Sequence, residues 1–400
     1  MRMRGIRRLG WVVVLLLQAV AMAGYAAPAS PFLLLEASQM AAYKAAYAKG
    51  SASEVKQVKA LLAEADQVLA TGPYAVTFKK QLPPSGNKHD YMSQAPYWWP
   101  DPTKPDGKPY IQKDGLKNPE STNLKDSESL TKVCEGVKAL GLAYYFTGEE
   151  KYAARASKLL RVFFLDADTR MNPNLSFGQG IPGMADGRSY GIIESRHLTE
   201  IPDALALMNG AKSIDANLVS GLKSWYKQFT QWLLTSQIGR EEGNNKNNHG
   251  TFYDVQVVDY LLFTGDKAQA KQHLENQTVP RLASQIEPDG SQPLELARTR
   301  PWNYTTMNLQ GWVELALLAP KAGVDLWHYA TSDGRGLRQA VAWFRPYLLQ
   351  QKKMERPDVA PTNNNTILAL YNHAGRIYPE LEVAKVFALY PDYVRVPWAF

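Results

Sequence analysis

The chain has 400 residues, with 45 basic and 38 acidic side chains, six histidines and a single cysteine. One cysteine excludes an internal disulfide, and the scattered histidines show no metal-ligand spacing, so we expect neither a metal nor another cofactor. The net charge of +7 is not gathered into a basic stripe, which argues against a nucleic-acid partner.

The first 26 residues are typical of an export signal. A basic start is formed by Arg2, Arg4, Arg7 and Arg8. The apolar run Trp11–Leu17 follows, too short to span a bilayer as a helix, and small residues allow cleavage after Ala23 or after Ala26. We therefore expect a periplasmic or secreted protein without membrane contact after cleavage, the alternative being an uncleaved anchor. Without the four arginines the mature chain carries 41 basic and 38 acidic side chains, or +3.

From residue 27 to 400, apolar residues recur at helical spacing and no Gly/Ser-rich linker intervenes, which predicts a single domain. The predicted helices form pairs: 37–48 with 53–69, 129–145 with 150–164, 252–262 with 267–275, and 366–372 with 381–389. Gly148, Gly265 and Gly375 are each expected to end the first helix of a pair as a left-handed C-cap. Repeated antiparallel pairs without alternating strands predict an all-α protein, a toroid of helix hairpins.

Two long stretches, 74–119 and 171–188, interrupt the helical pattern. They are rich in Pro, Gly and Asn, and the first contains Tyr97-Trp98-Trp99-Pro100. Long loops are usually functional or disordered, and the density of aromatic residues argues against disorder. We expect ordered loops over one mouth of the toroid.

These loops offer candidate substrate-binding residues. Trp98 and Trp99 have rings suited to stacking on sugar faces, or they serve only to pin the loop to the scaffold. Asn174, Gln179 and Arg188 are candidates for lining the cleft, and the guanidinium of Arg188 suits a substrate carboxylate.

Asparagines surround a histidine at positions 244–250, and Asn is unfavourable inside helices because its side chain competes for backbone hydrogen bonds. Asn248 is a candidate for binding a carboxylate, and His249 for neutralising that carboxylate or acting as a base. Alternatively, the asparagine caps the following helix and the histidine is a surface residue. The remaining members of the run are predicted to be capping or loop residues: Asn244, Asn245 and Asn247.

A second segment, residues 295–304, supplies cations and a phenol. Arg298 is a candidate for assisting carboxylate binding or lowering the pKa of Tyr304, or else it pairs with Glu295. Arg300 is a rival for the same role. Tyr304 lies in an apolar helical pattern, where a tyrosine is normally part of the core, so its catalytic role depends on its partners.

Together these groups match the needs of β-elimination from a 4-linked uronate. The reaction removes the C5 proton and expels the C4 oxygen, so it needs a neutralised carboxylate, a base and an acid. A glycoside hydrolase is a weaker alternative, because carboxylate pairs such as Glu194 with Glu200 have no mechanistic spacing. A protein that binds uronans without catalysing their cleavage is the third hypothesis.

The chain resembles the alginate lyase superfamily, meaning polysaccharide lyase family 5 and the related family 38, from about Tyr97 to Pro361. The resemblance is carried by four motifs: Pro96–Pro102, Asn172–Leu175, Asn247–Thr251 and Leu294–Thr299. It implies an incomplete (α/α) barrel of about six or seven hairpins. It also implies an active site with an Asn-His pair, an Arg and a Tyr, which fall here on Asn248, His249, Arg298 and Tyr304.

The resemblance implies an acidic polysaccharide as the substrate but does not specify which uronate it contains. It also leaves the oligomeric state undetermined. D-mannuronate and D-glucuronate place the C5 hydrogen and the C4 oxygen on the same side, so one tyrosine can serve as base and then as acid. L-guluronate has the opposite C5 configuration and needs groups on both faces, with His249 as base and Tyr304 as acid. Poly-mannuronate is therefore the first expectation, with glucuronan as the alternative.

Overall fold

Helix hairpins with glycine caps build the protein, as the sequence predicts. In the computed structural model, which describes residues 30–360 and 363–399, α3 (Asp126–Thr147) is followed by Gly148 at φ 70° and then by α4 (Glu150–Leu160). In the same way α8 (Asn248–Thr264) ends at Gly265, with φ 93°, before α9 (Lys267–His273). Glycine has no Cβ to clash at positive φ, so each hairpin turns sharply.

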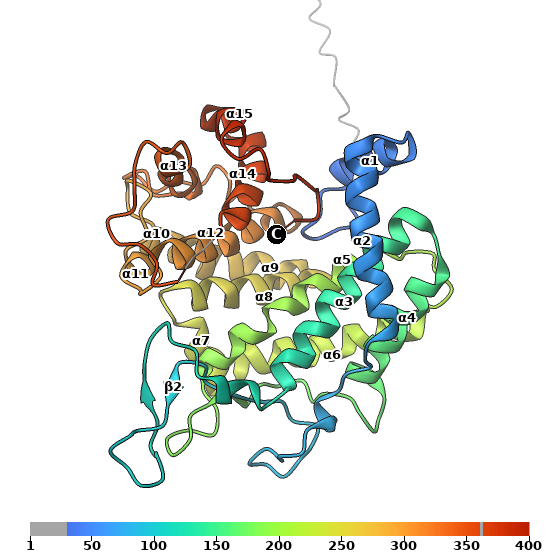
Figure 1. Cartoon of the computed structure of the whole chain (residues 1–400), viewed down its shortest axis with the longest axis vertical. Helices are drawn as coiled ribbons and strands as arrows, with labels where there is room; N and C mark the ends of the chain where they lie inside the picture. Colours follow the sequence, from blue (N-terminus) through green and yellow to red (C-terminus); the bar gives the residue numbers. More distant parts are fainter. Residues whose placement is uncertain (1–29, 361–362, 400) are drawn as a thin grey trace, which may run out of the picture. The chain divides into compact units, whose positions relative to one another are not determined.

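The remaining helices complete the pairs around these two hairpins (Figure 1). They are α1 (Ala37–Ala48), α2 (Ala52–Ala70), α5 (Glu200–Leu207), α6 (Ala216–Thr235), α7 (Gln237–Gly243), α10 (Val279–Gln285), α11 (Pro293–Leu296), α12 (Pro301–Leu318), α13 (Leu337–Leu348), α14 (Asn365–Ile377) and α15 (Val383–Ala388). Short 3-10 and π segments join them: η1 (Val76–Phe78), η2 (Pro119–Thr122), η3 (Arg161–Leu165), η4 (Ser189–Thr199), η5 (Leu274–Thr278), η6 (Ala319–Ala322) and η7 (Pro379–Leu381).

An inner row of helices is surrounded by outer ones, which makes the fold an (α/α) toroid. Along the inner row α3 contacts α5 and η4, η4 contacts α8, α8 contacts α12, and α12 contacts α14. The inner helices α3, α8 and α12 are buried on nearly all sides, whereas α4 and α13 are amphipathic and bury one face. Glu36, just before α1, pairs with His373 of α14 at 2.9 Å, so the last hairpin returns to the first.

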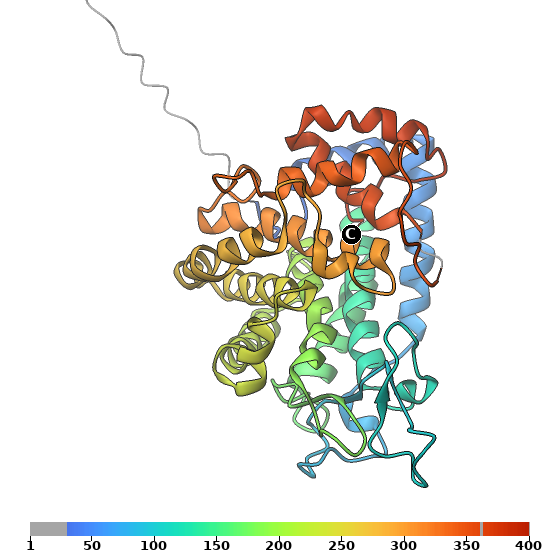
Figure 2. The same ribbon diagram turned by 90° about the vertical axis from the view of Figure 1, so that its left-hand side faces the viewer.

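The two long loop stretches lie together at one end of the helices, at the bottom of Figures 1 and 2. They contain short strands that the sequence did not predict. β1 (Met92–Gln94) pairs in parallel with β4 (Phe177–Gly180), and β2 (Trp98–Trp99) pairs antiparallel with β3 (Ile111–Gln112). The first pairing connects the two stretches into one layer of loops.

Some helix boundaries differ from the predictions. The expected turn at Ala374–Gly375 was wrong, since α14 continues to Ile377. A Cβ on Gly375 would lie 2.5 Å from the side chain of Val383, so this glycine allows close packing against α15 and does not end a helix. Cys134, the single cysteine, is buried in α3.

The described residues from 31 onward, 31–360 and 363–399, cluster as one compact unit. The predicted export signal, residues 1–26, lies outside the described residues. Within the part of the chain that the structure describes, no helix is long and apolar enough to cross a membrane.

Candidate active site

Asn248 and His249 lie at the start of α8, just beyond its N-cap. The cap is Asn247, whose side chain accepts a hydrogen bond from the backbone N–H of His249 at 3.2 Å. Asn247 therefore has the capping role expected for this part of the run, while Asn248 and His249 lie inside the helix.

Buried Asn248 is held by the carboxylate of Glu295 in α11. Its backbone N–H donates to Oε1 at 2.6 Å, and its Nδ2 donates to Oε2 at 2.8 Å. Burial raises the pKa of Glu295, and the hydrogen bonds from Asn248, with the charges of Arg298 and His249, oppose the rise. Glu295 thus fixes the amide of Asn248 and lies within electrostatic reach of two other candidate residues.

His249 is oriented by a second buried carboxylate, Glu242 of α7. Nδ1 of His249 lies 2.6 Å from Oε1 of Glu242, whose side chain is 0% exposed, and Asn245 donates to the other oxygen at 2.7 Å. A carboxylate acceptor places the proton on Nδ1, which leaves Nε2 as the acceptor of the neutral ring. The ring of Tyr190 lies against the imidazole, with centroids 4.3 Å apart.

Arg298 and Tyr304 form a stacked pair at the start of α12. The guanidinium carbon of Arg298 lies 3.8 Å from the ring centroid of Tyr304. Asp114, from the first loop stretch, holds the other side of the guanidinium, with Oδ1 at 2.8 Å from Nη2 and Oδ2 at 3.3 Å from Nε. Asp114 therefore takes the position that Glu295 was considered for, because the Glu295 carboxylate is used by Asn248.

The hydroxyl of Tyr304 donates to the hydroxyl of Tyr97 at 3.2 Å. Burial and then Tyr97 raise the pKa of Tyr304, and the charge of Arg298 opposes the rise without overcoming it. Arg298 therefore acts on this pKa in the expected direction, and burial outweighs it. Tyr304 holds its proton at neutral pH, which equips it as an acid.

The loop candidates divide into two groups. Arg188 donates to Gln179 Oε1 at 2.7 Å, and its guanidinium lies 4.7 Å from the Tyr190 ring and 6.0 Å from the Trp98 ring. Burial lowers the pKa of Arg188, and nearby Tyr190 and Glu242 oppose this. Gln179 has φ 49°, a strained conformation for a residue with a side chain, of the kind that clusters at functional sites.

The second group makes contacts within the loop layer. Trp99 donates from its indole to the carbonyl of Leu116 at 2.9 Å, which matches the loop-pinning alternative. Asn174 donates to Asp90 at 3.3 Å and accepts from the backbone of Ser176, so its amide is used to shape its own loop.

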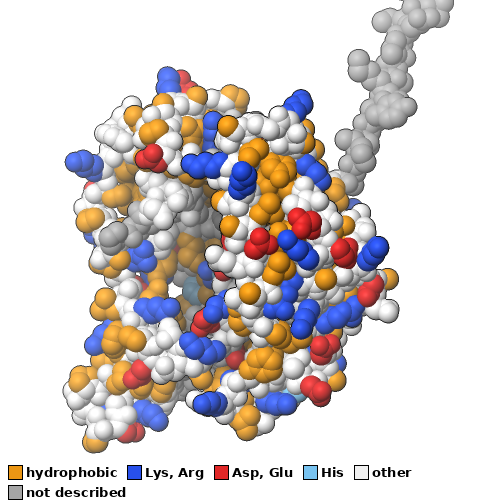
Figure 3. All heavy atoms as spheres, turned by 45° about the vertical axis from the view of Figure 1, so that its right-hand side comes forward, with side chains coloured by type: hydrophobic (Ala, Val, Ile, Leu, Met, Phe, Trp, Pro, Cys, Tyr) orange, Lys and Arg blue, Asp and Glu red, His pale blue; other side chains and the backbone are white. Residues whose placement is uncertain are grey.

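Arg300 is the N-cap residue of α12, and its carbonyl accepts the backbone N–H of Tyr304 at 3.0 Å. The stacking on Tyr304 favours Arg298 over Arg300 as the arginine of the site. The space-filling view shows a deep hollow in one face of the protein with Lys and Arg side chains near its rim (Figure 3). Such a surface suits an acidic polymer.

Known proteins share the sequence pattern and the fold of this chain. The sequence profile described as Alginate lyase matches residues 75–354. The chain belongs to the alginate lyase family. It is a polysaccharide lyase, and the hydrolase and non-catalytic alternatives are set aside.

Solved structures of the family share the fold of this lyase. An alginate lyase from Bacteroides ovatus is 38% identical, with a TM-score of 0.85, and the match covers 92% of this chain and 96% of that one. Alginate lyase A1-III from Sphingomonas species A1 is 16% identical, with a TM-score of 0.50 and coverage of 80% and 87%. A variant of A1-III complexed with a tetrasaccharide has 15% identity, a TM-score of 0.52 and coverage of 80% and 88%. A search of curated proteins found no match.

Sequence reasoning missed the groups that orient the candidates. Asp114, Glu242 and Glu295 act through contacts that only the fold creates, and Tyr190 carried no pattern of its own. Tyr97 lay inside a recognised motif, yet its contact with Tyr304 joins residues 207 positions apart. Glu242 lies seven positions before His249, and this was the one local signal, too common to be specific.

Proposed function

We propose that this lyase cleaves alginate by β-elimination and prefers its mannuronate blocks. The observation that carries the proposal is that two pairs of polar residues lie near Glu295. Asn248 and His249 form one pair, and Arg298 stacked on Tyr304 forms the other. An amide, an imidazole and a guanidinium can neutralise the substrate carboxylate, which makes the C5 proton more acidic. Tyr304 can then exchange protons with C5 and the leaving oxygen.

Mannuronate places both reacting positions on one face of the sugar, so Tyr304 alone can receive the C5 proton and deliver it to O4. Its pKa is raised, so the hydroxyl must first give its proton to solvent as the substrate binds, and the charge of Arg298 stabilises the phenolate that is left to receive the C5 proton. Guluronate requires a base on the opposite face. Nε2 of His249, left as an acceptor by Glu242, supports that second course, so poly-guluronate is the second candidate substrate and glucuronan the third.

The test is a substrate panel of poly-mannuronate, poly-guluronate and glucuronan, read by the ultraviolet absorbance of the new C4–C5 double bond. We expect the fastest rise on poly-mannuronate. Tyr304→Phe should lower kcat by about a hundredfold to ten-thousandfold, the usual contribution of a general acid–base, while Tyr347→Phe on α13 controls for loss of a tyrosine hydroxyl. A fully active Tyr304→Phe enzyme would remove this residue from the mechanism.

We also propose that the lyase is exported to the periplasm. The basic, apolar and small-residue segments of the first 26 residues support this. Fractionation of cells that express the full chain, with and without those residues, tests it, and recovery of both forms in the cytoplasm contradicts it.

A further inference from the structure

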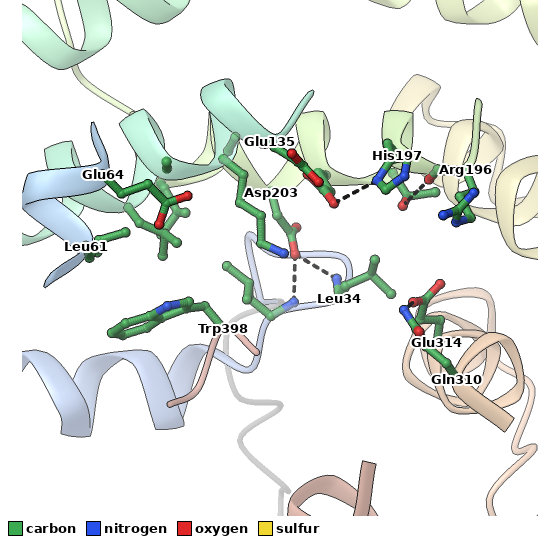
Figure 4. Close-up of a pocket in the computed structure, with 18 of the residues that line it drawn as sticks. Leu34, Leu61, Glu64, Glu135, Arg196, His197, Asp203, Gln310, Glu314 and Trp398 are labelled. Carbon is green, nitrogen blue, oxygen red and sulfur yellow. Dashed lines mark hydrogen bonds and ion pairs between the residues drawn. The ribbon is translucent and has the colours of Figure 1, made fainter. Parts of the chain in front are cut away.

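A second chamber lies further along the same inner helices that carry the active site. It has a volume of about 530 Å³, and its walls come from α2, α3, η4, α5, α8, α12, the segment before α1 and the C-terminal segment (Figure 4). None of the candidate active-site residues lines it. Helix α12 presents Tyr304 to the active site from its first turn, and Gln310 and Glu314 to the chamber from later turns.

The chamber has a partly buried cation, Arg196, with no carboxylate in the described part of the chain in contact with it. Arg196 donates to the carbonyl of Ile193 at 3.1 Å, and among the described residues no carboxylate oxygen lies within 4.0 Å of its guanidinium. Burial lowers the pKa of Arg196, and more distant carboxylates, Glu314 first, oppose this. Removing part of an arginine's hydration is costly unless something else compensates its charge.

Hydrogen-bonding groups surround Arg196. Figure 4 shows Glu314 and Gln310 below it and His197 beside it. Gln310 donates to one oxygen of Glu314 at 2.8 Å, and Glu200 lies 3.4 Å from Nδ1 of His197. These amide, imidazole and carboxyl groups can exchange hydrogen bonds with sugar hydroxyls.

The other side of the chamber combines apolar side chains with the carboxylate of Glu64. Figure 4 shows the indole of Trp398 with Leu61 near it, across the chamber from Arg196. Trp398 is positioned by Tyr43 and Phe146, at ring distances of 5.0 and 5.4 Å. An indole face fits the apolar face of a sugar ring.

Asp203 also lines the chamber, but its carboxylate already has partners. It accepts the backbone N–H groups of Leu34 at 2.8 Å and Leu35 at 2.6 Å, and also that of Leu33. Asp203 therefore closes the wall by anchoring the segment before α1, and it does not compete with a ligand for Arg196.

We propose that this chamber is a second saccharide site, which binds a short uronate with its carboxylate on Arg196 and its ring against Trp398. The choice of a uronate rests on the proposed function, since that reaction releases acidic saccharides. Two sources share this chemistry, a free hexuronate and the unsaturated oligosaccharide product. A guanidinium forms two parallel hydrogen bonds with a carboxylate, which neutral sugars cannot offer.

The test is calorimetric titration of the full chain with sodium D-glucuronate and, separately, with purified unsaturated oligo-uronates. D-glucose serves as the neutral control. Free glucuronate has no glycosidic bond to cleave, so its binding is measured whether or not the protein degrades alginate. Failure of the proposed function instead appears as no ultraviolet rise on any uronan.

We expect Arg196→Gln to weaken uronate binding at least about tenfold, because a charge-assisted pair is lost. Lys138→Gln, at a half-buried position of the chamber, should weaken binding about threefold, and it decides the matter if Arg196→Gln does not fold. Arg338→Gln, on an arginine with 60% of its side chain exposed, is the matched control and should bind as the unmodified chain does.

Three results would overturn the proposal. The first is unchanged uronate binding in Arg196→Gln together with weakened binding in Arg298→Gln, which would place the ligand in the active site. If Arg196→Gln does not fold, unchanged binding in Lys138→Gln takes its place in this comparison. The second is equal binding of D-glucose, which would remove the role of the carboxylate. The third is the absence of measurable uronate binding.

Discussion

Glu242 is the residue whose replacement tests the proposed orientation of His249 most directly. Its carboxylate is 0% exposed and bonds Nδ1 of His249 at 2.6 Å and Asn245 at 2.7 Å. Glu242→Gln keeps the shape and one acceptor oxygen but removes the charge. Glu242→Leu removes both hydrogen bonds.

The magnitudes follow from these contacts. A hydrogen bond to a charged group contributes about 1.5–3 kcal/mol and a neutral one about 0.5–1.5 kcal/mol, so removing the charge costs about 1–1.5 kcal/mol. If His249 acts in the rate-limiting step, kcat/KM of Glu242→Gln should fall by about tenfold, since each 1.4 kcal/mol is a factor of ten. The kcat/KM of Glu242→Leu, which loses the whole interaction, should fall by about a hundredfold.

Initial rates on poly-mannuronate, read by ultraviolet absorbance, provide the assay, with thermal unfolding as the check on folding. Glu241→Gln is the matched control, because this neighbouring glutamate is exposed and pairs only with Gln237 in the same helix. The reasoning is refuted if folded Glu242→Gln and Glu242→Leu enzymes turn over at the rate of Glu241→Gln.

Three further predictions concern other parts of the protein. Asp114→Asn should lower kcat/KM about tenfold, because it releases Arg298. The free energy of unfolding should change by less than about 1 kcal/mol, since the Asp114–Arg298 pair is partly exposed. Equal losses of activity and of stability, both expressed as free energies, would indicate a purely structural pair. Burial raises the pKa of Glu314 from 4.5 to about 7, so its neutral form stabilises the fold below pH 4.5 and this contribution is lost as pH rises to about 7. The free energy of unfolding, measured in urea at pH 4 and pH 8, should therefore lose on the order of 3 kcal/mol less in Glu314→Gln than in the unmodified protein. Identical pH dependence of stability in the two proteins would contradict this. Gly250→Ala places a Cβ 2.0 Å from the carbonyl of Asn245 and should destabilise the fold by at least about 2 kcal/mol, measured as a lower melting temperature. An unchanged melting temperature would contradict this and would mean that the backbone moves freely.

The helix hairpins were predictable because their signals are local. Apolar periodicity and the glycines at 148 and 265 lie within the segments they specify, and the structure has a C-cap at each of those two positions. Gly375 shows the limit of the same signal. Its role depends on Val383 of the next helix, which no local pattern reveals.

The candidate site was partly predictable for the same reason. Asn248 and His249 are adjacent in sequence. Arg298 lies just before and Tyr304 just after the helix start that Pro301 marks, so each pair could be identified as a unit. Their relation to each other depends on Glu295, which joins α11 to the start of α8. That contact arises from the packing of two hairpins.

The sequence by itself determined four helix pairs, the caps at Gly148 and Gly265, the motif residues and hence the family of reaction, because all of these depend on neighbours along the chain. Only the tertiary structure decided which groups orient the chemistry. Asp114 meets Arg298 across 184 positions and Tyr97 meets Tyr304 across 207. The tertiary structure also decided the protonation of Tyr304, since burial outweighs the nearby guanidinium. Burial and long-range pairing follow from how the inner helices and the loop layer pack, and no local spacing encodes them.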